Sequence, residues 1–454
     1  MATIPASIRN KYLRGTLPFG TVYRLLSEGG IVLGGQLASG IAGVAAVSYF
    51  SSLLPPSEYG LLTLALLSVI LCQTIFWGVG AALVRFFGTA FDNGTLKSLL
   101  AAIWTEQKKR TICLIAIALI CWLILLVFNY SSNVLWIALL VFLTATMSCY
   151  GALFDQLHTA VRNRLPVAMH QAAVAWMKIL SVGCIIYLFG ASASCAIAGI
   201  CLAVFIVAIW QYSSYSLEKK SLIQQTKGNQ SSVDWIGSVS RFSTPFVFWN
   251  LAIVAQQSAD RWALHWNCSS DDLGSYSAVF GITLIPVTLL FQCASQVARP
   301  IFFRNAGNEG ELEKQVIVFQ QGTQFVKLSC IGMLLITFVS YLCSDLIVSS
   351  LLDSRYWSAE PLVPLFVLTG CLAGISQIIE LQIQVFAKSR VLAVVRIANS
   401  VVLILVVFLS AYYFGMYGVG IATLLSQVTV VFSLFFISLI YFRRIRGQVC
   451  RQCA

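Results

Sequence analysis

The sequence predicts an all-α polytopic membrane protein with about 12 transmembrane helices, arranged as two six-helix bundles around a central cavity. The first observation is composition: of 454 residues, 58% are hydrophobic and 10% are charged, with a mean hydropathy of +0.84. Soluble domains carry about 25% charged residues, because they need a polar surface that 29 Lys and Arg with 17 Asp and Glu cannot supply here. The ordinary content of 31 Gly, 10 Pro and 14 Cys excludes the collagenous, disordered and disulfide-scaffold classes.

The second observation is a series of long apolar runs. A hydrocarbon core about 30 Å thick requires roughly 20 apolar residues at 1.5 Å rise per residue. Twelve runs meet this requirement: 29–54, 60–84, 111–128, 133–153, 166–189, 193–212, 244–264, 273–297, 323–343, 361–386, 391–412 and 417–442. The first run is longer than a signal-peptide core and no cleavage site follows it, so we expect it to be a span.

The third observation is the distribution of basic residues, because Lys and Arg accumulate in short loops on the cytoplasmic side. Only Arg355 lies in the six connections on the opposite side, and Lys178, Arg261 and Lys327 lie inside or at the ends of spans. We therefore expect both termini to be cytoplasmic. This sorting also accounts for the net charge of +12, so no nucleic-acid partner is predicted. The other 25 basic residues fall in seven alternate regions: 1–28, 85–110, 154–165, 213–243, 298–322, 387–396 and the tail from 443.

The polar stretch between the sixth and seventh spans divides the chain into equal halves. We expect an N-terminal six-helix bundle over 1–212, a cytoplasmic linker over 213–243 and a C-terminal six-helix bundle over 244–454. Paired bundles of this kind place a site near the midplane between them. The segment 91–110 has apolar residues at near-helical spacing but is too polar to span, so we expect it to lie on the inner membrane surface.

Ionisable residues within the spans are the candidate functional residues, since one at the bilayer centre costs about 2.5–3.5 kcal/mol on translocon scales. Lys178 lies in the middle of its span and is the best candidate, although it could instead be a structural cation paired with a neighbouring helix. Lys327 lies one turn inside its span and is equally compatible with an interfacial anchor. The acids inside the spans are Asp260, next to Arg261, and Glu380.

Sequence signatures of enzymes are missing from the chain. It contains no GxxxxGK[ST], HExxH or GxSxG motif, and its three histidines show no i, i+4 pair. The tail pair Cys450 and Cys453 forms a single CxxC without a second pair, which is a weak metal signal. We therefore predict no enzyme activity, no metal site and no cofactor, and expect any transport to be driven without ATP hydrolysis by this chain.

Several segments resemble one known family along nearly the whole chain. They are LLPPSEYGLLTLALL (53–67), GVGAALVRFFG (78–88), DRWALHW (260–266), LGSYSAV (273–279), SQVARP (295–300) and GMYGVGIATLLSQ (415–427). In this order and spacing they are similar to the bacterial oligosaccharide and polysaccharide (O-antigen, Wzx-like) flippases of the multidrug/oligosaccharidyl-lipid/polysaccharide exporter superfamily. The resemblance implies a two-lobed bundle in the bacterial inner membrane that moves undecaprenyl-diphosphate-linked sugar units to the outer leaflet for surface polysaccharide such as lipopolysaccharide.

A substrate of that kind needs cationic and hydroxylated groups in a cavity, because its diphosphate and sugars must leave water. The basic residues available are Lys178, Arg261, Arg299, Lys327 and Arg24, of which only Arg261 and Arg299 stand inside matching motifs. For coupling to a cation gradient, Glu380 is the candidate proton-binding group, since burial penalises its ionised form. Asp260 beside Arg261 is expected to stay ionised.

The sequence leaves two other functions open. A cation-coupled multidrug exporter of the same superfamily would have a smaller and more acidic pocket, whereas here basic candidates outnumber acids. A membrane scaffold that holds glycan polymerase and glycosyltransferases would tolerate neutral replacement of every intramembrane charge. Either way the expected partners are membrane lipid and, for the flippase, the lipid-linked oligosaccharide.

Overall fold

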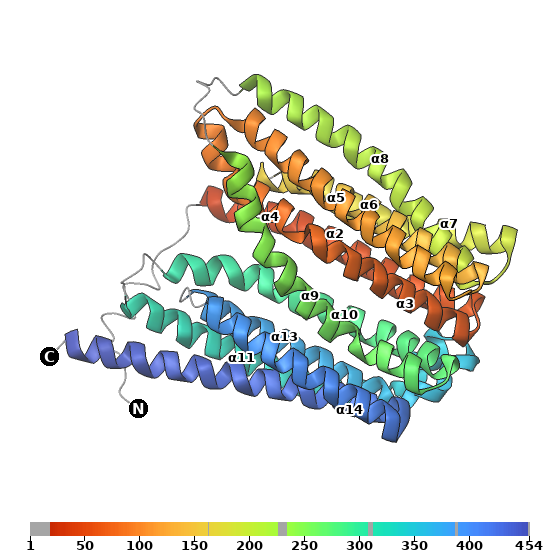
Figure 1. Ribbon diagram of the computed structural model, residues 1–454. Helices are drawn as coiled ribbons and strands as arrows, with labels where there is room; N and C mark the ends of the chain where they lie inside the picture. The colour runs from red at the N-terminus through yellow and green to blue at the C-terminus, as the bar shows by residue number, and fades with distance from the viewer. Residues whose placement is uncertain (1–18, 162, 226–233, 307–311, 386–388, 453–454) are drawn as a thin grey trace.

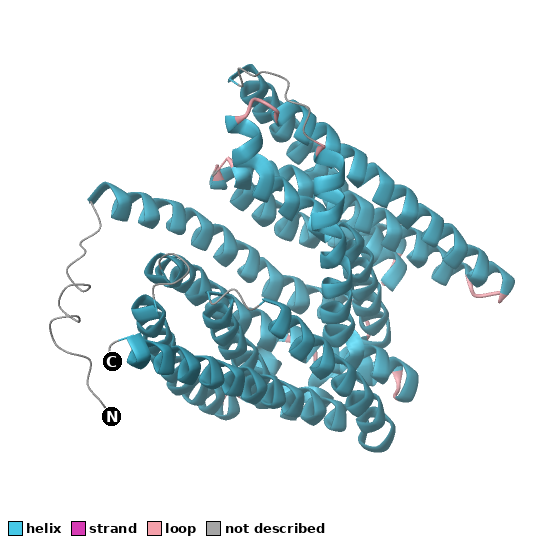
Figure 2. Ribbon diagram, turned by 60° about the vertical axis from the view of Figure 1, so that its left-hand side comes forward, coloured by secondary structure: helices cyan, strands magenta, loops and turns pink. Residues whose placement is uncertain are grey.

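The computed structural model describes residues 19–161, 163–225, 234–306, 312–385 and 389–452, and within these ranges the chain forms helices without strands (Figure 2). The helices of the first part are α2 (Phe19–Leu53), α3 (Pro56–Gln73), η1 (Thr74–Phe76), α4 (Trp77–Asp92), α5 (Leu96–Val127), α6 (Ser132–Ala160), α7 (Arg164–Phe189) and α8 (Ala193–Gln225). The second part contains α9 (Trp235–Asn267), α10 (Ser270–Ala306), α11 (Leu312–Leu342), α12 (Ser344–Leu351), η2 (Ser354–Leu362), α13 (Val363–Val385) and α14 (Ser389–Gln452).

Over their described residues the predicted apolar runs lie almost entirely on helices, and the predicted all-α membrane fold is confirmed. In the described ranges, ten helical segments are long and apolar enough to cross a membrane. Twelve spans were predicted, and the lower number of segments has two causes. One segment, 396–443, contains two predicted spans, which are separated at Gly415 by a non-helical backbone with φ 60° that glycine adopts without steric cost. The other cause is α9, which is more polar because Asn250, Gln256 and Asp260 are buried inside the protein rather than facing lipid.

The predicted span 60–84 is interrupted near its middle. Helix α3 ends at Gln73, η1 forms one short 3₁₀ turn, and α4 begins at Trp77. Backbone groups released by such a break must find partners inside the protein, since lipid offers none. Arg110 of α5 supplies one, because its Nη1 donates to the Ile75 carbonyl oxygen at 2.6 Å.

The helices form two groups that α9 connects. Figure 1 shows α2–α8 gathered on one side and α10, α11, α13 and α14 on the other, with α9 crossing between them. The start of α9 packs on α4 and α5 through Trp235 and Val239, and its end joins α14 through Ala263 and Leu264 in a separate core. Helix α8 continues to Gln225, so of the expected linker 213–243 only 226–234 lies between the two helices.

The prediction for 91–110 is wrong. Residues from Leu96 onward begin α5, one continuous helix to Val127, and the apolar side chains that suggested a membrane-surface helix are buried in the protein. Leu96, Leu99 and Ile103 are at most 1% exposed and pack in one cluster with Trp235 and Val239 of α9. Helical periodicity identifies an apolar face but does not reveal whether lipid or another helix covers it.

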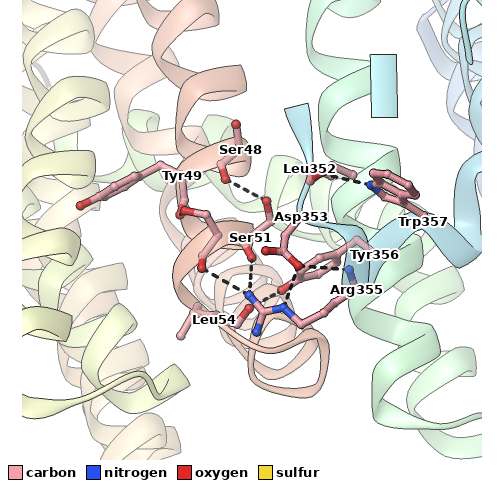
Figure 3. A network of polar contacts seen from close by, with 10 residues as sticks. Ser48, Tyr49, Ser51, Leu54, Leu352, Asp353, Arg355, Tyr356 and Trp357 are labelled. Atoms are coloured by element: carbon pink, nitrogen blue, oxygen red, sulfur yellow. Dashed lines mark hydrogen bonds and ion pairs between the residues drawn. The ribbon is translucent and has the colours of Figure 1, made fainter. Parts of the chain in front are cut away.

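One end of the bundle is closed by contacts between the two groups of helices (Figure 3). The Arg355 guanidinium in η2 donates to the carbonyl oxygens of Ser51 and Ser52 at 3.4 and 3.3 Å, and the Tyr356 hydroxyl donates to that of Leu54 at 2.8 Å. We call this set the α2–η2 contact. Asp353 fixes the Arg355 side chain at 2.8 Å, and the hydrogen bond from Arg355 lowers the pKa of the Asp353 carboxyl. The ion pair therefore persists at neutral pH.

Helices α3 and α10 seal the same end through backbone packing. A Cβ added at Gly274 would stand 1.9 Å from the Pro56 carbonyl oxygen, so only glycine allows the helices to approach this closely. The Tyr59 and Tyr356 rings meet edge to face at 5.8 Å beside this crossing. The two groups of helices are thus held together at the end where η2 lies, opposite the C-terminal end of α14 (Figure 1).

Removing the Arg355 guanidinium should loosen this closed end. We expect Arg355→Ala to raise the rate at which a cysteine placed at Ser51, which is 0% exposed, reacts with a soluble maleimide in a cysteine-free background. The matched control is Arg241→Ala, which removes an exposed arginine of α9. Equal labelling rates in the two variants would show that Arg355 does not hold the end closed.

Candidate functional site

The first group of helices encloses a polar cavity of about 490 Å³. Helices α6, α7 and α8 supply most of its wall and α2 closes one side. The volume lies within the range of small-ligand sites. Its lining residues are Ser39, Ser148, Ala152, Asp155, Gln156, Thr159, Val167, Gln171, Val174, Lys178, Val204 and Gln211.

Lys178 is the one basic side chain in this lining. It lies near the middle of α7, and among the described residues no carboxylate forms an ion pair with it. Ser148, Gln156 and Gln171 line the same space and carry groups that can donate hydrogen bonds to an anion. The hydroxyls of Ser39 and Thr159 donate instead to carbonyl oxygens of their own helices, at 2.8 and 2.9 Å. The arrangement therefore suits an anionic group held by a point charge and neutral donors.

A buried carboxylate on the wall is held by a separate polar network. Asp155 of α6 is 7% exposed, and its Oδ1 lies 2.7 Å from Nδ1 of His170 on α7. Gln211 of α8 donates from Nε2 to the Asp155 Oδ2 at 2.9 Å. Glycine at position 151 makes room for this amide, because a Cβ there would stand 2.2 Å from the Gln211 Oε1. Three helices are joined through one carboxylate.

The network continues through His170, and a second histidine ring lies 6.2 Å from it. The fully buried His170 ring packs edge to face on Trp210 with centroids 4.6 Å apart, and its Nε2 lies 3.4 Å from the Ser214 hydroxyl. His158, 2% exposed, lies 3.8 Å from Glu218. Sequence reasoning missed Asp155 and His158 because the predicted span ended at 153, which assigned both to a loop, whereas α6 continues to Ala160.

The acidic candidate Asp260 and the basic candidate Arg261 lie together, away from the Lys178 cavity lining. Arg261 Nη1 lies 3.3 Å from Asp260 Oδ1, and the guanidinium stacks over Phe280 at 4.0 Å. The fully buried Tyr276 donates its hydroxyl to Asp260 Oδ2 at 3.1 Å. Both charges are thus compensated by α9 and α10 near the closed end of the bundle.

The second acidic candidate, Glu380 of α13, forms an ion pair with Arg396 of α14. Arg396 Nη2 also donates to the Ser376 hydroxyl at 3.3 Å, and both charged side chains are less than one-fifth exposed. The sequence assigned Arg396 to the basic connection 387–396, so the pair was not foreseen. Proton binding at Glu380 would therefore have to compete with an arginine.

The remaining predicted cavity residues are not brought to Lys178 by the described structure. Lys327 is exposed on α11 and does not line the cavity. Arg24 and Arg299 lie on α2 and α10, with side chains outside the described residues. Over the described ranges, no group of three His, Cys, Asp or Glu side chains is placed to hold a metal ion.

Comparison with known proteins gives a family and a fold. Residues 25–306 match the family described as polysaccharide biosynthesis protein. Lipid II flippase MurJ in an inward closed conformation has a similar fold, with TM-score 0.67 at 11% identity over 90% of this chain and 88% of that chain. No curated protein matches the sequence.

Two further solved structures are similar over almost their whole length. One is an inward-facing multidrug resistance MATE family transporter of the MOP superfamily, with TM-score 0.63 and 13% identity over 90% of this chain and 96% of that chain. The other is a MOP superfamily transporter from Pyrococcus furiosus, with TM-score 0.62 and 11% identity over 93% of this chain and 96% of that chain. Identities this low show the fold alone, which is that of MATE transporters and MurJ.

Loss of His170 should destabilise the first group of helices, because the Asp155 carboxylate would lose a buried partner at a cost of about 1–3 kcal/mol. We expect His170→Ala to lower the apparent unfolding temperature in detergent. Asp155→Asn with His170→Ala should lose less stability than the sum of the two single variants, since the carboxylate charge that His170 compensated is gone. Strict additivity would contradict the coupling inferred from the 2.7 Å contact.

Proposed function

The chain belongs to the polysaccharide biosynthesis protein family, and from that premise we propose that it flips undecaprenyl-diphosphate-linked oligosaccharides from the inner to the outer leaflet of the bacterial cytoplasmic membrane. Its transporter fold, shared with a lipid II flippase, supports the proposal. The observation that carries it is Lys178, a lysine without an ion-pair partner among the described residues, at mid-helix in a polar cavity.

The chemistry of such a substrate matches this cavity. Its diphosphate carries negative charge, and its sugars carry hydroxyl groups that lose water on entering the membrane. Lys178 compensates part of the charge, while the amides of Gln171 and Gln156 and the hydroxyl of Ser148 can replace water around the head. The polyprenyl chain needs no protein partner, because it is already solvated by lipid.

Alternating access would require the closed end to open. In the proposed cycle the α2–η2 contact breaks while contacts at the opposite end form, with both termini in the cytoplasm. Glu380 and Asp260 are the proposed coupling carboxylates, each acting by exchanging its arginine partner for a cation. Arg261, Arg299, Lys327 and Arg24 are proposed to contact the diphosphate in other states of the cycle. Glycosyltransferases would supply the lipid-linked unit and a polymerase would consume it in O-antigen-type synthesis.

The proposed role of Lys178 is tested by complementation of cells that lack this gene. We expect Lys178→Ala to abolish export of the surface polysaccharide at normal membrane abundance, and Lys178→Arg to retain part of it because the charge remains. Lys219→Ala, which removes a lysine of α8 outside the cavity lining, is the matched control. Export that falls only in proportion to folded protein would assign Lys178 a structural role.

A further inference from the structure

A second cavity of about 330 Å³ adjoins the Lys178 cavity. The two share Ser148, Ala152 and Gln156 of α6, so the second space lies next to the one that Lys178 lines. The helix break at η1 forms part of its wall, since Gln73, Phe76 and Trp77 line it. The other lining residues are Gly80, Ala81, Gln107, Cys149 and Leu153.

Gln107 is the residue that points to a ligand. Its side chain lines this cavity and is 1% exposed, and its amide Nε2 finds no hydrogen-bond partner among the described residues. Leaving a buried donor without an acceptor costs about 1–3 kcal/mol. An acceptor that enters the cavity, such as a hydroxyl oxygen, would remove this cost.

Three helices bring glutamine amides to the same space. Gln73 ends α3, Gln107 lies on α5, and Gln156 lies on α6. Glycine at position 80 allows the close packing, because a Cβ there would stand 2.7 Å from the Gln156 Cγ. Amides both donate and accept hydrogen bonds, so they suit hydroxyl groups, which do the same.

The cavity lining contains no charged residue. The nearby cation Arg110 is committed to protein partners, since it donates to the Ile75 carbonyl at 2.6 Å, the Ser243 hydroxyl at 2.5 Å and Glu106 at 3.1 Å. The aromatic rings of Trp77 and Phe76 complete a wall on which the apolar face of a ring can pack. Neutral amides with an aromatic wall match a sugar rather than a phosphate.

We propose that this second cavity is the subsite for the sugar that follows the diphosphate in the lipid-linked head, with the Gln107 amide donating to a sugar oxygen. The inference rests on the proposed flippase function and deepens it. Lys178 recognises charge in one of the two adjoining cavities, and the glutamine amides recognise the neutral saccharide in the other. The subsite thereby distinguishes a loaded carrier lipid from a bare one.

The test compares two lipids at equilibrium with purified full-length protein in detergent. One is undecaprenyl diphosphate, and the other is the lipid-linked oligosaccharide fraction extracted from cells deleted for this gene. Gln107→Leu should weaken binding of the saccharide lipid about tenfold, the equivalent of one lost hydrogen bond, and leave the affinity for undecaprenyl diphosphate unchanged. Lys178→Ala should weaken both. Gln224→Leu, at an exposed position of α8, is the matched control.

Protein stability separates a binding role from a structural one. Because Leu removes a buried amide donor that lacks a partner, Gln107→Leu should keep or raise the unfolding temperature without ligand. Equal losses of affinity for both lipids, no loss for either, or a destabilised variant would overturn the subsite. If the wild-type protein binds neither lipid, the proposed function fails together with the subsite. If the wild-type protein binds both lipids and Gln107→Leu binds them with unchanged affinity, the proposed subsite is refuted while the proposed function stands.

Discussion

Hydrocarbon cannot accept or donate a hydrogen bond, and the architecture of this chain follows from that constraint. Backbone groups are satisfied within helices, and where the helix breaks at Thr74–Phe76 a buried arginine bonds the released Ile75 carbonyl. The carboxylates of Asp155, Asp260 and Glu380 follow the same rule, since each has a partner on a neighbouring element or residue. Lys178 and Gln107 differ from these residues, and each lines a cavity. Lys178 has no ion-pair partner among the described residues, and the Gln107 Nε2 has no hydrogen-bond partner among them.

The two cavities adjoin along α6 and differ in chemistry. The charged cavity lies between α6, α7 and α8, and the neutral cavity lies at the α3–α4 break. Both belong to the first group of helices, while the contacts that close the bundle join α2 and α3 to η2 and α10. Ligand binding and closure therefore share α2 and α3, which gives a mechanical route by which an occupied cavity can change the closed end. A ligand acts on such an equilibrium only through unequal affinity for its two states.

The sequence was sufficient for the membrane-spanning helices and for the position of Lys178 inside one of them, because a long apolar run and a lone lysine within it are local signals. It was insufficient for the side chains that form hydrogen bonds and ion pairs between helices. Asp155, Gln107 and Arg110 lie in parts of long helices that extend past the apolar runs, so each was assigned to a loop or to a membrane-surface helix. The sequence likewise assigned Arg396 to a basic loop, whereas the structure shows that it forms an ion pair with Glu380. The three residues of the helix break after Gln73 include neither proline nor glycine, so the sequence contains no signal that predicts the break. Contacts between distant helices depend on packing, which hydropathy does not encode.

The central claim is that a lipid-linked saccharide, and not a drug cation, crosses the membrane through this protein. The direct measurement uses proteoliposomes that carry the saccharide lipid in both leaflets and reports the fraction accessible to an external, membrane-impermeant lectin. We predict that the protein makes the inner pool accessible with time, whereas protein-free vesicles do not, and that ethidium loaded into the same vesicles does not move. Ethidium transport with an inaccessible inner saccharide pool would contradict the account and assign the protein to drug export.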